Sequence, residues 1–149
     1  MAITSCDHTG ITVTDIERSL AFWTSIMGCK LLYRVRSPPH EIADQIMGVR
    51  GVEMLVAMLE APGGYHIELL QYLAPAGREH FRPRPCDVGS VHLAFTVDNI
   101  AEMLDGLLAA GCVVNGKAGG APDSDVLYLY LHDFDGVTIE LVQQPKRTE

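Results

Sequence analysis

Four side chains able to bind a metal stand at matching places in the two halves of this 149-residue chain. His8 and Glu68 lie in the first half, and His92 and Glu140 lie in the second. Imidazole nitrogens and carboxylate oxygens without a thiolate suit Ni, Co, Mn, Fe or Zn in a site that leaves room for water or substrate oxygens. We therefore expect one divalent metal ion per site, and the residue types do not distinguish among these metals.

The segments around these residues form an internal repeat. Residues 8–20 align with residues 92–104, and residues 67–71 align with residues 139–143. The spacing from His to Glu is longer in the first half by about a dozen residues, which we place in the segment 37–50 as a loop or a short helix. A repeat of this kind in a chain of single-domain length predicts two modules that share one structure.

Each half is predicted to run strand, helix and then further strands, which makes the fold class α+β. The first helix follows a cap at Thr14 or Asp15 and ends near Gly28, and the second helix ends at Gly111. Gly63-Gly64 and Asp135-Gly136 are predicted turns between paired strands. The predicted strands cover residues 7–13, 52–59, 65–72, 91–97, 126–132 and 137–142.

The alternation of side chains along these strands predicts where the four ligands point. Val91, Leu93 and Phe95 are apolar and should face the helix, so His92 points to the opposite face. Ile67 and Leu69 place Glu68 in the same way, and the second half repeats the pattern at Glu140. A carboxylate within an apolar strand is costly to desolvate unless it is paired or binds a metal. We therefore expect the sheet to curve around a metal cavity.

Composition restricts the partners of the chain. A net charge of −8 argues against nucleic-acid binding, which needs clustered Lys and Arg. No apolar run is long enough to span a membrane, and the N-terminal residues do not read as a signal peptide. The four cysteines lack paired metal spacing and are expected to be reduced thiols. We therefore expect a cytoplasmic protein that acts on a small molecule.

Several of these segments, taken together, resemble the vicinal oxygen chelate superfamily, which includes glyoxalase I, bleomycin resistance proteins and dioxygenases. They are residues 7–13, Phe22-Trp23 with Met27-Gly28, the Ile-Glu-Leu endings, and residues 133–141. The resemblance implies two tandem βαβββ modules forming a curved mixed sheet around a metal cavity. It implies one domain over residues 1–149, with module one at about 5–74, a linker at about 75–87 and module two at about 88–143. It further implies a homodimer, in which some members build each site from both subunits, and a substrate with adjacent oxygens.

Within that superfamily the His/Glu/His/Glu set is similar to that of glyoxalase I, a lactoylglutathione lyase. By this resemblance the chain is a lyase or isomerase that moves a proton through a metal-chelated enediolate or enolate, with Glu140 and Glu68 as candidate bases. Small glyoxalases of this type usually have Arg four residues after the first His and Asn four after the first Glu. This chain has Thr12 and Tyr72 there, which removes a bidentate partner for an anionic glutathione arm.

Three alternatives remain open from the sequence. A CoA-thioester epimerase similar to methylmalonyl-CoA epimerase would need cations for the nucleotide phosphates. An extradiol-type dioxygenase would need only two His and one Glu around iron, and Glu68 would crowd its open positions. A non-catalytic binding protein of the antibiotic-resistance type would need no metal. The arginines available to an epimerase are Arg34, Arg36, Arg78, Arg82 and Arg84.

Some residues near the ligands are weaker candidates for a substrate pocket. His66 shares the face of Glu68, two residues away, and is either a substrate group or a solvated histidine of the rim. Tyr128 and Tyr130 share one strand face, where packing is favoured over pocket lining. Thr12 and Tyr72 complete the set, and His40, His80 and His132 show no partner by spacing.

Overall fold

The computed structural model describes residues 2–145, which fall into two compact units that meet in the sequence at Glu79 and His80. Each unit is a four-stranded mixed sheet whose first strand pairs in parallel with its last. The sheet orders are β1-β4-β3-β2 in the first unit and β5-β8-β7-β6 in the second. The strand order and pairing of the first unit thus recur in the second.

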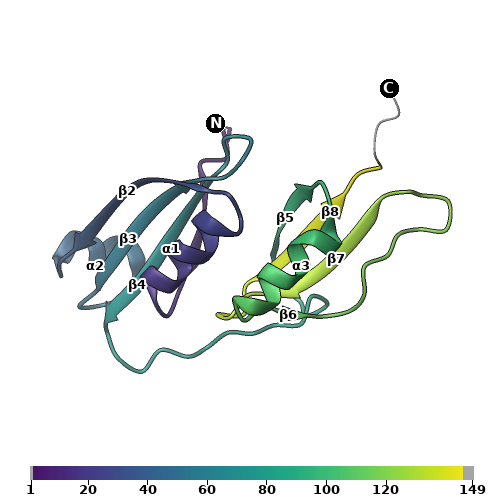
Figure 1. The fold of residues 1–149 in the computed structure, drawn as a ribbon. Coiled ribbons are helices and arrows are strands. Elements are labelled where there is room, and N and C mark those ends of the chain that lie inside the picture. The colour runs from purple at the N-terminus through teal and green to yellow at the C-terminus, as the bar shows by residue number, and fades with distance from the viewer. Residues whose placement is uncertain (1, 146–149) are drawn as a thin grey trace. The chain divides into compact units, whose positions relative to one another are not determined.

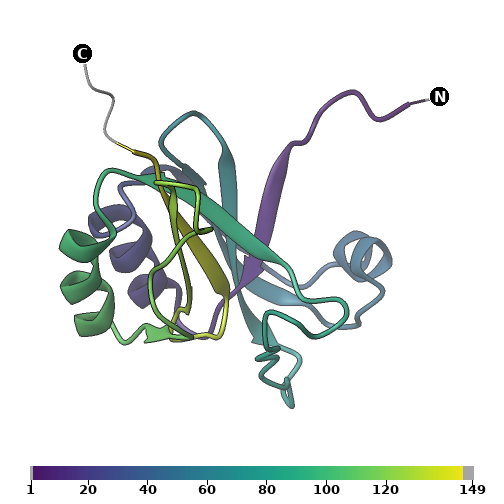
Figure 2. The same ribbon diagram turned by 90° about the vertical axis from the view of Figure 1, so that its right-hand side faces the viewer.

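In the first unit, helix α1 packs on one face of the sheet, and a second helix, α2, lies on the other face (Figures 1 and 2). The remaining strand pairs of this unit are antiparallel. Its elements are β1 (His8–Thr12), α1 (Ile16–Ser25), β2 (Lys30–Ser37), α2 (Glu41–Met47), β3 (Glu53–Glu60) and β4 (His66–Ala74).

In the second unit a single helix, α3, packs against the sheet (Figure 1). Strand β6 is only two residues long, so β7 has little antiparallel support on that side. The elements are β5 (His92–Val97), α3 (Ile100–Ala109), β6 (Val113–Val114), β7 (Leu127–His132) and β8 (Thr138–Gln143).

Both long helices begin in the same way. Asp15 and Asn99 have extended backbone and directly precede α1 and α3. The side-chain oxygen of each accepts hydrogen bonds from the backbone N–H groups of the residues two and three positions later. The N–H of the first helical residue donates instead to a glutamine side chain on the strand that carries the glutamate. Ile16 N–H donates to Gln71 Oε1 (3.0 Å), and Ile100 N–H donates to Gln143 Oε1 (2.8 Å). The repeated sequence therefore repeats a hydrogen bond that ties the helix start to the strand carrying the glutamate.

The core of each unit lies between its sheet and its long helix. In the first unit Ile67 and Leu69 of β4 and Trp23 of α1 are fully buried. In the second unit Ile139 and Leu141 of β8 are buried in the same places. This confirms the predicted alternation, because the residues between these pairs, Glu68 and Glu140, face away from the long helix.

The structure also differs from the sequence prediction. The residue pattern did not locate β2 and β6, although the βαβββ modules implied by the family resemblance require a strand after each long helix. Every residue of β2 except Ser37 is exposed, so it has little of the half-buried alternation that marks a strand. Val91 was predicted to face the helix, but it precedes β5 and is 77% exposed. The segment 37–50 does contain the short helix that was one of its two predicted forms. No helix within residues 2–145 is long and apolar enough to cross a membrane.

Candidate metal centre

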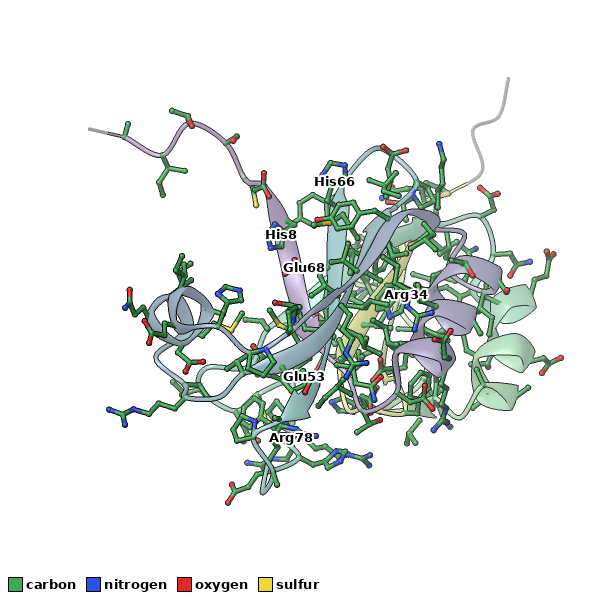
Figure 3. The ribbon with its side chains drawn as sticks, turned by 90° about the vertical axis from the view of Figure 1, so that its left-hand side faces the viewer. His8, Arg34, Glu53, His66, Glu68 and Arg78 are labelled. Atoms are coloured by element: carbon green, nitrogen blue, oxygen red, sulfur yellow. The ribbon has the colours of Figure 1, made fainter. Side chains whose placement is uncertain are left out.

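The first pair of candidate ligands, His8 and Glu68, lies on the sheet face opposite α1, which we call the ligand face of the first unit (Figure 3). His8 Nε2 is 3.4 Å from Glu68 Oε2. The other ring nitrogen, Nδ1, is 2.6 Å from Asp7 Oδ2. This contact with Asp7 is the main cause of a raised pKa at His8, with a smaller contribution from Glu68 and an opposing effect of burial. Asp7 therefore orients the ring so that Nε2 faces the carboxylate.

The second pair, His92 and Glu140, has the same arrangement on the second unit's ligand face, opposite α3. His92 Nε2 is 3.1 Å from Glu140 Oε2. The Glu140 side chain is 14% exposed, against 22% for Glu68. A half-buried carboxylate next to an imidazole is a typical setting for a metal ligand, although an ion pair with a protonated histidine has the same geometry.

The two pairs occupy equivalent places in their sheets. His8 is the Cα partner of His66, two residues before Glu68 in the parallel strand β4. His92 is likewise the partner of Thr138, two residues before Glu140 in β8. The same strand register therefore applies to both His–Glu pairs.

The neighbours of the two pairs differ. Tyr130 is the cross-strand partner of Glu140, and its hydroxyl is 3.5 Å from His92 Nε2. Its ring meets the imidazole edge-on, with centroids 5.2 Å apart. Desolvation raises the pKa of Tyr130, and the Glu140 carboxylate raises it further. The first unit has Met58 in the position of Tyr130, so an apolar side chain stands beside Glu68 there.

The donor set fits a divalent ion, because each pair directs one imidazole nitrogen and one carboxylate oxygen to a shared point. Neither pair is complete by itself. Within residues 2–145 no group of three or more His, Cys, Asp or Glu side chains is arranged to hold a metal ion. Each unit thus offers two ligands of a set that needs at least three.

The weaker candidates for pocket residues are placed as follows. His66 lies on the ligand face and approaches Glu60, with Nε2 3.9 Å from Oε2. Thr12 is exposed on the same face. The Tyr72 hydroxyl donates to Met47 Sδ at 3.6 Å, so the tyrosine contacts α2. Tyr128 is 42% exposed rather than buried in the core.

Two histidines without a predicted partner have structural contacts. His40 caps α2, with Nδ1 accepting from the Ala43 N–H at 3.1 Å. His132 lies between Asn115 Oδ1 (2.8 Å from Nδ1) and the Pro83 carbonyl (3.0 Å from Nε2), which docks the segment around residue 83 onto the second unit. Sequence reasoning missed Asp7 as a site residue, although a carboxylate directly beside a predicted histidine ligand was a usable signal.

The arginines that an epimerase would use for phosphates contact acceptors within their own units. A phosphate would have to displace these partners, and Arg34 lies on the α1 side of the sheet, away from His8 and Glu68 (Figure 3). The contacts join Arg34 to Glu17, Arg36 to Glu53, Arg78 to the Pro75 carbonyl, Arg82 to the Phe134 carbonyl, and Arg84 to Asp87.

Two consecutive βαβββ units with matched His–Glu pairs define a class of small proteins whose sites are built from a duplicated module. The sequence profile of the Glyoxalase/Bleomycin resistance protein/Dioxygenase superfamily matches residues 7–130. The chain belongs to this superfamily. The predicted family and the predicted α+β fold of two repeated modules are confirmed.

Curated relatives cover almost the whole chain. A lactoylglutathione lyase of Salmonella typhimurium is 28% identical over 138 residues, which are 91% of this chain and 90% of that protein. A lactoylglutathione lyase of Escherichia coli O157:H7 is 26% identical over 137 residues, with 92% and 90% covered. These similarities support a glyoxalase-like enzyme of the superfamily without fixing its substrate.

Solved structures share the fold. A glyoxalase family protein from Bacillus cereus superposes with a TM-score of 0.85 at 24% identity, covering 96% of this chain and 95% of that one. A mutant of the fosfomycin resistance protein FosX from Listeria monocytogenes, complexed with Mn(II) and a dihydroxypropylphosphonic acid, superposes at a TM-score of 0.63 and 16% identity. That superposition covers 97% of this chain and 94% of the FosX chain.

Proposed function

We propose that the chain is a metal-dependent lyase or isomerase of the glyoxalase type, with His8, Glu68, His92 and Glu140 holding one divalent ion. The observation that carries this proposal is the duplicated pair. In each half a His Nε2 lies close to a Glu Oε2, at 3.4 Å in the first half and 3.1 Å in the second. The two residues come from equivalent parallel strands paired in the same register. One pair supplies one nitrogen and one oxygen donor, whereas the two pairs together supply two of each, which is enough for a metal site.

The proposed reaction moves a proton between neighbouring carbons of a substrate with adjacent oxygens. A bound ion supplies the Lewis acid that polarises those oxygens and acidifies the carbon-bound proton. A glutamate carboxylate, Glu140 or Glu68, takes this proton and returns it to the adjacent carbon. His8 and His92 hold their positions throughout, and Asp7 keeps the His8 ring oriented.

The relatives named lactoylglutathione lyase support this reaction type over the alternatives. A dioxygenase needs open positions for oxygen and a catechol, which a fourth protein ligand would take. An epimerase needs phosphate-binding cations, and the five arginines considered for that role contact acceptors within their own units. Neither alternative is favoured by a contact in the described part of the chain.

The first experiment measures bound metal per chain by elemental analysis, on protein purified without chelator and then supplied with Ni, Co, Mn, Fe or Zn. We expect about one ion per chain in the wild type. Glu68→Gln and Glu140→Gln should each lose most of it, because each removes one of four ligands. His66→Gln is the matched control, since His66 shares the ligand face with Glu68 and should leave the stoichiometry unchanged.

Two results would contradict the proposal. The first is a wild type that retains no metal. The second is a Glu68→Gln variant that keeps full occupancy while Glu140→Gln loses it, because the two pairs would then not share one ion.

Mixing the two inactive variants tests the proposed homodimer. If each centre takes ligands from two copies, a mixed dimer of Glu68→Gln and Glu140→Gln regains one intact set of four and part of the activity. If each centre lies within one chain, mixing restores nothing. Isomerisation of a hemithioacetal provides the activity readout.

A further inference from the structure

The ligand face of the first unit carries an apolar cluster that includes a residue of α2, a helix without an equivalent among the described elements of the second unit. Val52, Met54 and Val56 are buried there, and Met47, Leu70 and Tyr72 pack against them while staying partly accessible. Met47 comes from α2, the helix of the segment 37–50 that makes the first repeat longer than the second. The first unit therefore has an apolar cluster on the same sheet face as His8 and Glu68. Figure 3 shows α2 on the side of the sheet that carries these two labelled residues.

Helix α2 is held in place by polar contacts of its capping residue and of a residue in its middle. His40 caps its start, as described above. Asp44 accepts hydrogen bonds from the backbone N–H groups of Gly51 (2.9 Å) and Val52 (3.1 Å), which lower the pKa of its carboxyl. These bonds fix the helix to the loop leading into β3. Helix α2, which carries Met47, is thus fixed to the rest of the first unit.

The apolar cluster and the glutamate meet above Gly10. A Cβ added at Gly10 would stand 3.4 Å from Leu70 Cδ1 and 3.8 Å from Glu68 Oε2. Gly10 is exposed, and its backbone is not in the left-handed region, so no turn requires a glycine at this position. The equivalent residue of the second unit is Ala94, because Gly10 pairs with Glu68 as Ala94 pairs with Glu140. The missing methyl group leaves open the space between the carboxylate and Leu70.

Two acidic side chains lie on this face of the unit, and the positions considered for holding an anionic arm are not basic. The two positions that resemble glutathione-holding residues in small glyoxalases hold Thr12 and Tyr72, and the tyrosine contacts Met47. Glu60 and Glu68 lie on the ligand face, whereas Arg34 lies on the α1 side, in contact with Glu17. A substrate arm placed next to Leu70 and Met47 would therefore meet methyl and thioether groups.

We propose that Gly10, Leu70, Val56, Met47 and Tyr72 form an apolar subsite beside Glu68, which takes an uncharged apolar substituent of the substrate. The substrate class is then a small molecule with two adjacent oxygens and an aryl or branched alkyl group. This inference rests on the proposed function, because it assigns the substrate of the same centre. An apolar group buried there is stabilised by its removal from water, and it needs no charged partner.

The test uses two hydroxamic acids that chelate through the same pair of oxygens. Benzohydroxamate carries a phenyl ring where acetohydroxamate carries a methyl group. Both are titrated into the full chain with zinc added, and the methyl groups of its methionines are followed by NMR. We expect benzohydroxamate to bind at least tenfold more tightly and to shift the signals of Met47 and Met58. The signals of Met27 and Met103, in the first unit's core and on α3, should stay in place.

Gly10→Ala is the decisive variant, because it adds only the methyl group that the second repeat already carries. It should lower the affinity ratio of the two probes toward one while changing acetohydroxamate binding less than twofold. Met47→Gln, which keeps the shape of the side chain but makes it polar, should reduce the ratio as well. The reciprocal variant Ala94→Gly should leave the ratio unchanged.

Several outcomes would overturn the inference. They are a ratio near one in the wild type, a ratio that changes only in Ala94→Gly, or shifts confined to Met103. Failure of the proposed function gives a different result. If the chain binds no zinc, the titration still reports on Met47 and Met58, and the absence of any shift there at millimolar benzohydroxamate rejects the apolar subsite independently.

Discussion

The two units of this protein share one backbone plan but surround their His–Glu pairs differently. In the first unit Asp7 contacts Nδ1 of His8, and the Glu68 carboxylate lies near apolar side chains that include Leu70. In the second unit Tyr130 stands beside both members of the pair, and a single helix packs against the sheet. Duplication therefore preserved strand register and helix anchoring, while the residues around each pair diverged.

This difference separates two tasks. The repeated features place a histidine and a glutamate at a fixed spacing across two parallel strands, and they need only backbone pairing and a buried opposite face. The features that are not repeated decide what approaches each pair. We expect substitutions in the repeated features to act alike on both units, and substitutions in the other features to act on one.

The largest expected effect is on the equivalent core positions of the two units. Leu69→Ala and Leu141→Ala remove matched, fully buried side chains next to the two glutamates. Each should lower the free energy of unfolding by roughly 2–5 kcal/mol, since a cavity remains where the side chain packed. Chemical denaturation measures the loss. Hydrogen exchange at Leu59 and Leu131, one in each unit, shows which unit opens.

If Leu69→Ala speeds exchange equally at Leu59 and Leu131, the two units open together and do not unfold separately. If each substitution speeds exchange only in its own unit, the two units unfold independently. Tyr128→Ala is a suitable control, because Tyr128 is 42% exposed and does not belong to the core.

A smaller effect is expected at the turns before the glutamate strands. Gly64 and Gly136 both have positive φ, at 86° and 91°, so alanine should cost each unit about 1–3 kcal/mol of stability. At Gly136 the added Cβ would also stand 2.5 Å from Arg82 Cγ, whereas at Gly64 it would meet nothing within 4 Å. We expect Gly136→Ala to be the more destabilising of the two in thermal unfolding.

The double variant with Arg82→Ala isolates this steric contribution. If Arg82 is the cause, Gly136→Ala in the Arg82→Ala background should cost about as much as Gly64→Ala. Equal costs of the two single variants would mean that the arginine moves aside freely.

Much of the fold could be predicted because the repeat states it twice. The buried strands β4 and β8 and the helices α1 and α3 show clear periodicity, and their ends carry Asp15, Asn99, Gly28 and Gly111. Strand β2 shows no such pattern, because it is an edge strand whose side chains are exposed on both faces. An exposed strand is held by its backbone pairing with β3, and backbone pairing leaves little trace in residue type.

The equivalent positions of the two His–Glu pairs were predictable for the same reason, whereas their neighbours were not. Register places Tyr130 opposite Glu140 and Met58 opposite Glu68, and this pairing across strands cannot be obtained from spacing along one strand. The contact between Met47 and Tyr72 needs the position of α2, which depends on the polar contacts of His40 and Asp44. Asp7, in contrast, was available from the sequence as the residue before His8.

The next effect concerns the divergent neighbours. Asp7→Ala removes the carboxylate that orients His8 and should weaken metal binding about 10- to 100-fold, as is usual when such an orienting group is lost. Tyr130→Phe should weaken it by less than about fivefold, because a contact of 3.5 Å is at the limit of hydrogen bonding and contributes at most about 1 kcal/mol. Competition with a chelating dye measures both affinities. A larger loss of metal affinity in Tyr130→Phe than in Asp7→Ala would mean that the second pair depends more on its neighbour than the first pair does.

The smallest expected effect is on the hydrogen bonds that tie each helix start to its glutamate strand. Gln71→Met and Gln143→Met keep the side-chain length but remove the oxygen that accepts from Ile16 or Ile100. Each leaves one backbone N–H without its partner and should cost about 1 kcal/mol of stability. Because Gln71 lies three residues after Glu68, and Gln143 three after Glu140, the loss should be similar in the two units. Equal shifts in thermal unfolding would mean that this anchoring is a shared property of the duplicated module. A cost confined to Gln71→Met would place it with the features that distinguish the first unit, and the helix of the second unit would then depend on Asn99 alone.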